Sequence, residues 1–570
     1  MSARRRGLIA LLLFFAGTLV TFQAGRTQGF PRDEGYYFEA GELYAGWYEE
    51  LLTHPSKALT RASVDRWFGY NHEHPALMKT LFGLSWRLLH RCECPRQAGR
   101  HPVAYSHPHR TLSLLSEAEA FRLPADLFAG LLVALVFLFG AQAWSTGVGL
   151  VAAVLTLAAP RMFFHAQLAC FDAPVVTTWV ACVWAYWRAL SDRRWGWRAG
   201  VAFGLALATK HNGFFLPFVL GAHYLVVTAR ALRRGERFRF PVVFLWMAGL
   251  GPLIELAHWP WLWFDTVARF REYLAFHLHH VYYNMEYLGT NYNKPPFPWS
   301  YAFVMTLFTV PVTTLALGLG GAAVLLDDWR RERRGDPSFL PASPFSATCP
   351  GLLVGLNALF PLCIIAFTGA PIFGGVKHFL ATLPFLALLA GVALDRLVRY
   401  SVGVLGGTVR GARMAMAGAG VLVCLPAVAE TVRSHPYGLT HYNLLAGGPA
   451  GGADLGLNRQ YWGYSTRGVL PWLDEHAPRH AAVYWHDTNQ PILNMNVREG
   501  LLREDIGNTG LEEPGVRASS IAMVIHERHF NKYEYWIWDF FFPSGRTTKP
   551  ARVLTHEGVP IVTVYERPRP

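Results

Sequence analysis

Two neighbouring stretches near the start of the chain decide its fold: LIALLLFFAGTLV, residues 8–20, and RDEGYY, residues 32–37. The first stretch is an apolar run that follows three arginines, the pattern of a membrane helix with a cytoplasmic start. The second stretch places two carboxylates just beyond that run, at the edge of the membrane. An arbitrary Asp-Glu pair in such a position is usually solvated surface. Its meaning therefore depends on the rest of the chain.

The composition is that of a membrane protein. Of the 570 residues, 52% are hydrophobic and only 16% are charged, whereas soluble domains carry about 25% charged residues. Long apolar windows recur along the chain, which predicts several membrane spans. The net charge of +13 does not indicate a nucleic-acid partner, because the arginines cluster between apolar segments and so report membrane topology.

The hydropathy pattern predicts about eleven spans in an all-α polytopic fold. One further apolar segment, 75–89, has only about 15 residues and contains Lys79 and Arg87, which is short and charged for a span. We expect it to form an interfacial helix. The eleven expected spans are 7–24, 123–142, 147–166, 173–190, 198–210, 212–230, 240–257, 301–325, 350–367, 377–397 and 411–428.

The arginine-rich connections set the expected orientation. With 75–89 left out of the spans, the connections 188–198, 230–239, 330–334 and 396–413 all fall on one side. The positive-inside rule makes that side cytoplasmic. The chain is therefore expected to be a multi-pass protein of the cell (inner, cytoplasmic) membrane. Its N-terminus would be cytoplasmic, and residues 7–24 are expected to be a retained helix and not a cleaved signal peptide.

Two regions are expected outside the membrane. The first outer loop, 25–122, is predicted to contain interfacial helices such as 35–53, and it belongs to a membrane domain of residues 1–429. Residues 430–570 are predicted to form a small extracytoplasmic α/β domain. A helix is expected at 465–476, strands are expected at 481–485, 520–525, 552–555 and 561–565, and a turn is expected at 556–560.

This orientation brings polar residues from distant segments to the outer face. A scattered set of such residues would not be expected to sort to one side by chance. Each also has a structural reading: Asp172 precedes Ala-Pro as a helix N-cap does, and Lys210 could snorkel from a helix end. The residues are Arg32, Asp33, Glu34, Glu73, His74, Lys79, Asp172, Lys210, His211, Lys377 and His378.

Several of these residues lie in motifs that occur in order along 30–400. The acidic pair 33–34, His74-Pro75 with Lys79, and Arg122-Leu123-Pro124 are followed by Phe171-Asp172-Ala173-Pro174, Thr209-Lys210 and Lys377-His378. The series resembles the protein O-mannosyltransferase and lipid A aminoarabinose transferase group. That group belongs to the GT-C superfamily of polyprenyl-phosphate-sugar-dependent glycosyltransferases. One departure is Ala76, where the family often has a second proline.

The resemblance implies transfer of a sugar from a polyprenyl-phosphate donor to an acceptor hydroxyl or amine, with inversion at the sugar carbon. Such a reaction needs a base for the nucleophile, cations for the phosphate and exclusion of water. The resemblance makes Asp33 the base, with Glu34 and Asp172 as further catalytic carboxylates, and Glu34 is expected to position the acceptor or sugar. Lys210, His211 and Lys377 or Arg32 are expected to hold the phosphate, and the remaining expected substrate-binding residues are Glu73, His74, Lys79 and His378.

Several alternatives stay open at this point. No metal is assigned, although a divalent ion held by Asp33, Glu73 and Asp172 would suit a metal-dependent oligosaccharide or arabinose transferase. Cys92 and Cys94 with nearby histidines match no standard zinc spacing. A lipid or solute transporter or flippase is the rival from another class, but transporters usually show repeats and mid-membrane charges. The sugar is not identified, and the acceptor could be a lipid, a glycan or a protein.

Overall fold

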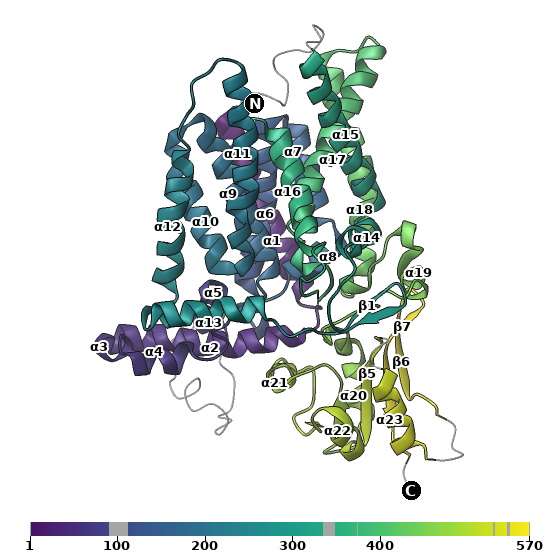
Figure 1. Ribbon diagram of the computed structural model, residues 1–570. Helices are drawn as coiled ribbons and strands as arrows, with labels where there is room; N and C mark the ends of the chain where they lie inside the picture. The colour runs from purple at the N-terminus through teal and green to yellow at the C-terminus, as the bar shows by residue number, and fades with distance from the viewer. Residues whose placement is uncertain are drawn as a thin grey trace.

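The computed structural model describes residues 2–90, 112–334, 348–372, 374–527, 531–543 and 548–568. A bundle of long helices forms the body of the molecule (Figure 1). Shorter helices cross one end of the bundle, and an α/β domain lies at that same end (Figure 1). Cys92, Cys94 and the histidines that follow them lie outside the described residues.

Every apolar segment expected to span the membrane contains a helix. Among the described residues, five helices are long and apolar enough to cross a membrane, or six if the pair α7–α8, bent by 74°, is one span. The count of eleven stays a prediction. The bundle consists of α1 (Ala3–Gly25), α6 (Glu117–Ala143), α7 (Thr146–Leu157), α8 (Pro160–Ala166), α9 (Asp172–Ser191), α10 (Gly196–Thr209), α11 (Leu216–Arg233), α12 (Val242–His258), α14 (Tyr301–Thr309), α15 (Val312–Arg334), α16 (Pro350–Ile365), α17 (Thr382–Val404) and α18 (Val409–Ser434).

Small residues allow a close helix contact between α1 and α6. A Cβ on Gly130 would lie 2.3 Å from the Phe14 carbonyl oxygen and 2.2 Å from the Thr18 hydroxyl. Helices in lipid gain little from the hydrophobic effect and depend on such close packing. The contact fixes the start of α6 beside the end of α1.

The helices across the end of the bundle come mostly from the first expected outer loop. They are α2 (Arg32–Thr53), α3 (Pro55–Ala58), α4 (Arg61–Phe68), α5 (Leu77–Leu89) and, from a later loop, α13 (Thr266–Leu278). Helix α5 has 13 residues, too few to cross a bilayer, as the sequence predicts. It packs on α2, where a Cβ on Gly83 would clash with the backbone of Gly41.

The C-terminal region contains the strands expected from the sequence. Strands β3 (Ala482–Trp485), β4 (Gly507–Asn508), β5 (Ile521–Ile525), β6 (Arg552–His556) and β7 (Val559–Glu566) form a sheet of order β4-β3-β5-β7-β6. Strands β6 and β7 form the predicted hairpin, with Glu557 and Gly558 at positive φ in its turn. The helices of the C-terminal region are α19 (Gly448–Asp454), α20 (Leu470–His476), α21 (Gln490–Arg498), α22 (Glu512–Ala518) and α23 (Asn531–Phe541).

The two ends of the bundle differ in what they carry. The first residues of α1 and the ends of α11, α15 and α17 lie at the upper end in Figure 1. The layer of short helices, a two-stranded hairpin β1–β2 (Met285–Tyr287, Thr290–Tyr292) and the five-stranded sheet lie at the lower end (Figure 1). The arginine-rich connections are thus opposite to the acidic pair that follows α1.

Candidate active site

Asp33 and Glu34 occupy the first turn of α2, because the helix begins at Arg32, three residues before the start expected from the sequence. Successive residues of an α-helix point about 100° apart. The two carboxylates therefore face different surroundings. The side chain of Asp33 is 19% exposed and that of Glu34 is fully buried.

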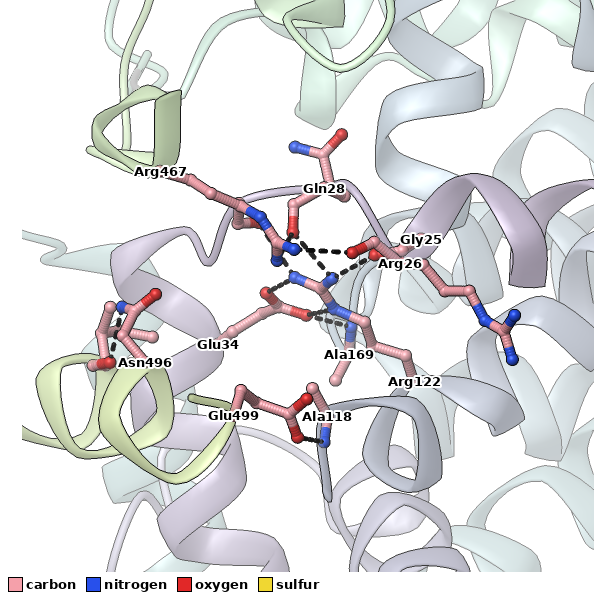
Figure 2. Close-up of polar contacts among 12 residues, drawn as sticks. Gly25, Arg26, Gln28, Glu34, Ala118, Arg122, Ala169, Arg467, Asn496 and Glu499 are labelled. Atoms are coloured by element: carbon pink, nitrogen blue, oxygen red, sulfur yellow. Dashed lines mark hydrogen bonds and ion pairs between the residues drawn. The ribbon is translucent and has the colours of Figure 1, made fainter. Parts of the chain in front are cut away.

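Glu34 forms a buried ion pair with Arg122 of α6 (Figure 2). Arg122 donates from Nε to one carboxylate oxygen at 2.8 Å and from Nη2 to the other at 2.5 Å. Glu34 also accepts from the backbone N–H of Ala169 at 2.7 Å. Both oxygens are thus occupied by protein, and the expected contact of Glu34 with sugar or acceptor is not available in this arrangement.

The same arginine holds the connection between α1 and α2. Arg122 donates to the backbone carbonyls of Gly25, Gln28 and Gly29 at 2.9 to 3.1 Å (Figure 2). Through Ala169, Glu34 ties this connection to the loop that leads into α9. The Glu34–Arg122 pair therefore fixes the position of Asp33 relative to the start of α9.

Asp33 faces Lys377, which comes from the 3-10 turn η4 (Gly375–His378). The Lys377 Nζ lies 3.4 Å from Asp33 Oδ2 and 4.5 Å from the centre of the Trp462 ring. The turn approaches Tyr461 so closely that a Cβ on Gly375 would lie 2.5 Å from the Tyr461 hydroxyl. A carboxylate, an ammonium group and an aromatic ring thus meet at one point.

Arg32 does not join this pair as a phosphate ligand would. Its Nη1 lies 2.6 Å from Asp487, while its Nε is 3.9 Å from Asp33. Asp487 and, to a smaller degree, Asp33 hold the pKa of Arg32 above its usual value. Arg32 therefore links the start of α2 to the C-terminal region.

Asp172 and Lys210, which the sequence predicts for separate roles, form one buried ion pair. Lys210 Nζ lies 2.6 Å from Asp172 Oδ1, and His165 Nδ1 lies 3.6 Å from Oδ2. The capping interpretation of Asp172 is wrong, because the N-cap residue of α9 is Phe171 and no side chain caps the helix. Snorkelling does not describe Lys210 either, since its side chain is buried.

A group of histidines lies next to these lysines. His211 begins the turn η2 (His211–Phe215), and its ring centre is 4.1 Å from that of His277 on α13. His74 is 5.9 Å from His277 and 5.5 Å from Phe171. His74 Nδ1, His211 Nδ1 and His277 Nε2 are buried without a hydrogen-bond partner among the described residues. Burial lowers the pKa of His277 to about 4, so this ring is neutral at pH 7.

Two buried groups show that the predicted residues converge. The pKa of Tyr37 is raised by burial first, and then by charges that include Asp33, Asp172 and Glu73. The pKa of His74 is lowered by burial first, and then by neighbouring groups that include the lysines Lys79, Lys210 and Lys377. Three carboxylates and three lysines from five segments thus act on neighbouring side chains.

Lys79 lies behind this cluster and not in it. Its side chain is fully buried, and its Nζ donates to the carbonyls of Asn71 and His74 at 2.5 and 2.8 Å. Burial lowers its pKa to about 7. Lys79 therefore shapes the turn that presents Glu73 and His74, and the expected substrate contact has no support in this geometry. Glu73 accepts from Asn71 Nδ2 at 2.9 Å. His378 follows Lys377 in η4 and acts electrostatically on His211.

Sequence reasoning missed several residues of the site. Arg122 stood in a quoted motif without a role, and His165 and Asp487 were not singled out. His165 is fully buried, and its ring lies 5.4 Å from that of Trp462. One available signal was the placing of His165 inside an apolar segment and of Arg122 at the edge of one, where ionisable groups need partners. Asp487 had no such signal, because it lies in a polar turn.

The metal alternative does not fit this arrangement. Asp33 and Asp172 each face a lysine, a cation where a divalent ion would need open carboxylate oxygens. Within the described residues, no group of three or more His, Cys, Asp or Glu side chains is arranged to hold a metal ion.

The comparisons with known proteins agree with the sequence motifs. Residues 109–261 match the family of dolichyl-phosphate-mannose-protein mannosyltransferases. This segment contains Arg122, Asp172 and Lys210, and it confirms the resemblance to polyprenyl-phosphate-sugar-dependent glycosyltransferases of the GT-C type. The search of curated proteins finds no match.

Two solved structures that are similar to this chain each contain a polyprenyl phosphate. ArnT from Cupriavidus metallidurans, bound to undecaprenyl phosphate, is 16% identical, with 97% of each chain covered and a TM-score of 0.48. The archaeal oligosaccharyltransferase AglB from Archaeoglobus fulgidus, in complex with an inhibitory peptide and a dolichol-phosphate, is 11% identical. That comparison covers 93% of this chain and 71% of AglB, with a TM-score of 0.45.

Proposed function

We propose that this protein is a membrane glycosyltransferase that moves a sugar from a polyprenyl-phosphate donor to an acceptor hydroxyl or amine on the outer face of the membrane. One observation carries the proposal: the Asp33–Lys377 and Asp172–Lys210 pairs come together with His74 at one end of a membrane bundle. The family matched by residues 109–261 supports a donor of this class.

Asp33 is the general base of the proposed reaction. Its carboxylate is partly exposed beside a cation, whereas both oxygens of Glu34 are taken by protein donors. The acceptor O–H or N–H gives its proton to Asp33 as its oxygen or nitrogen attacks the anomeric carbon. The bond from that carbon to the phosphate oxygen breaks, and the polyprenyl phosphate leaves with the electron pair. A single displacement of this kind inverts the sugar carbon.

Lys377 and Lys210 supply positive charge for the phosphate. Each is held by a carboxylate, so its ammonium group is already in place when the leaving charge develops. The neutral His211 and His74 rings add N–H donors beside them. Trp462, over Lys377, restricts water near the reacting groups. Glu34, Lys79 and Arg32 take positioning roles in this scheme.

The proposed setting follows the charge pattern of the chain. The arginine-rich end of the bundle faces the cytoplasm, and the end with the site faces outward. This puts the N-terminus of the chain on the cytoplasmic side of the cell (inner, cytoplasmic) membrane and residues 430–570 on its outer side. We keep the boundary near 429, although α18 continues to Ser434. A lipid, a glycan or a protein can serve as acceptor in this scheme.

The transporter alternative has less support from the geometry. Its charged groups would lie along a path through the membrane. Here the layer of short helices, whose members α2 and α13 carry Asp33 and His277, and the C-terminal region lie at one end of the bundle (Figure 1). This arrangement favours chemistry at the membrane surface over passage through the bundle.

The deciding experiment measures transfer of labelled sugar from a polyprenyl-phosphate donor to candidate acceptors, with purified full-length protein. Asp33→Asn is expected to lower the rate by at least about 100-fold, the lower range for loss of a general base. Glu475→Gln, at an exposed carboxylate, is the matched control and should keep full activity. Full activity in correctly inserted Asp33→Asn protein would refute the assignment, and substrate movement without any transfer product would favour a transporter.

A further inference from the structure

A cavity lies where the end of α1, the start of α6 and the C-terminal region meet. Its volume is about 300 Å³, room for on the order of ten water molecules at their liquid volume. Arg122 lines it, but Asp33, Asp172, Lys210 and Lys377 do not. The cavity is therefore separate from the proposed active site, and Arg122 connects the two because it also forms the ion pair with Glu34 (Figure 2).

Charges of both signs line this cavity. The basic residues are Arg26, Arg122 and Arg467, and the acidic residues are Glu119, Asp126 and Glu499. Equal numbers of each sign suit a ligand that carries both charges, and not a simple anion or cation. The remaining walls include the apolar side chains of Phe22, Phe30 and Leu501.

Asp126 indicates where a positive group of the ligand would bind. It is 2% exposed, and its Oδ1 has no hydrogen-bond partner among the described residues. A buried carboxylate oxygen without a donor is costly, so such an atom calls for a donor that the chain itself does not provide. An ammonium group in the cavity would supply it.

Arg26 indicates where a negative group would bind. The side chain is 50% exposed, and its Nε pairs with Glu119 at 2.7 Å. Within the described residues, Nε is the one hydrogen-bonded nitrogen of the Arg26 side chain. Its two Nη groups therefore point no donor at any described acceptor, and guanidinium groups bind phosphate in this way. Arg467 lies close by, with Nη2 on the Arg26 carbonyl at 2.7 Å (Figure 2).

The depth of the cavity matches a lipid headgroup. Helix α1 ends at Gly25, so Arg26 follows the last residue of a candidate span. The guanidinium also lies 5.3 Å from the Phe22 ring, within the last turn of that span. Phospholipid phosphates lie at this level, and basic pockets between membrane helices bind them.

We propose that this cavity binds the headgroup of a zwitterionic aminophospholipid. The phosphate lies on Arg26 and Arg467, and the ammonium group donates to Asp126 Oδ1. Because Arg122 lines the same cavity, a bound headgroup stabilises the connection that positions Asp33. The proposal concerns lipid binding alone and stands whether or not the protein transfers sugars.

The test uses the full-length protein in detergent with an equimolar mixture of phosphatidylethanolamine, phosphatidylcholine and phosphatidylglycerol of matched acyl chains. Native mass spectrometry measures which lipid stays bound. Phosphatidylethanolamine should be retained about tenfold more than the other two, because the choline group of phosphatidylcholine has no N–H to donate and the headgroup of phosphatidylglycerol carries no positive charge. Asp126→Asn and Arg26→Gln should each lower that retention about tenfold. Glu513→Gln, in an exposed pair with Arg517, is the control.

Three results would overturn the proposal. Equal retention of phosphatidylethanolamine and phosphatidylcholine would show that no donor reaches Asp126. Preference for phosphatidylglycerol would make the cavity a simple anion site. Arg26 is partly exposed, so Arg26→Gln should still fold. Unchanged retention in this variant would show that the lipid binds elsewhere. If Asp126→Asn fails to fold, the wild-type preference for phosphatidylethanolamine over phosphatidylcholine tests the ammonium contact, and Arg26→Gln tests the phosphate contact.

Discussion

Breaking the Glu34–Arg122 pair should destabilise the protein, because this pair holds four parts of the chain together. Glu34 is fully buried and Arg122 nearly so. In Glu34→Gln, one charge disappears, and the new amide N–H₂ must face the donors of Arg122 or Ala169. The guanidinium is then left buried without its counter-charge.

The size of the effect can be worked from the contacts. Glu34 accepts three hydrogen bonds, two of them from the charged Arg122. Removing one partner of a buried ion pair costs about 3–5 kcal/mol. With roughly 2–4 °C lost for each kcal/mol, the midpoint of thermal unfolding should fall by on the order of 10 °C. Detergent-solubilised protein with a fluorescence readout of unfolding gives this measurement directly.

The contrast with Asp33→Asn makes the reasoning refutable. Asp33→Asn should leave the unfolding midpoint within a few degrees of the wild type and lower transfer by at least about 100-fold, since Asp33 is partly exposed and makes two long ion pairs, with Lys377 and Arg32. Glu34→Gln should lower the midpoint, and its surviving folded fraction should retain activity. If Glu34→Gln unfolds like the wild type but transfers no sugar, Glu34 touches the substrate and the division of roles is wrong.

Three further predictions concern other ion pairs and a buried acid. Lys210→Met should cost about 3–5 kcal/mol by leaving Asp172 buried without its cation, and adding Asp172→Asn should recover stability in thermal unfolding but not transfer. Arg32→Met removes the 2.6 Å contact with Asp487, so hydrogen exchange near Asp487 should become faster, while Arg517→Met should leave it unchanged. Burial raises the pKa of Glu42 from 4.5 to about 8, so the folded protein holds a proton that the unfolded chain releases, and stability falls as pH rises from 4.5 to 8. Glu42→Gln should remove this loss, worth about 3 kcal/mol at pH 7, and unfolding midpoints that follow pH equally in both proteins would contradict it.

Much of the fold was predictable because it depends on local patterns. Apolar runs mark helices, alternating residues mark strands, and arginines mark one end of the bundle. The turn at Glu557 and Gly558 is an example, since Gly558 suits positive φ and the hairpin forms there. The same patterns brought Asp172 and Lys210 to one end of the bundle before any contact was known.

The contact partners of the charged side chains could not be predicted, because they depend on which side chains meet after the helices pack. The sequence offers Lys79 and Lys210 as equivalent lysines near helix ends. Lys79 points back to the carbonyls of its own turn, while Lys210 reaches Asp172 across the bundle. Nothing in the spacing of either residue distinguishes these outcomes.

The adjacent residues Asp33 and Glu34 show both what the sequence predicts and what it does not. Starting α2 at Arg32 makes Asp33 and Glu34 successive residues of one helical turn, which point in different directions. Only one direction can face Lys377, and the other must then enter the protein, where a carboxylate requires a partner. Arg122 is that partner. The acid that faces outward is thus available for chemistry because its neighbour holds the turn in place. We therefore expect that exchanging the two residues, with aspartate at 34 and glutamate at 33, destroys both stability and activity, although composition and charge are unchanged.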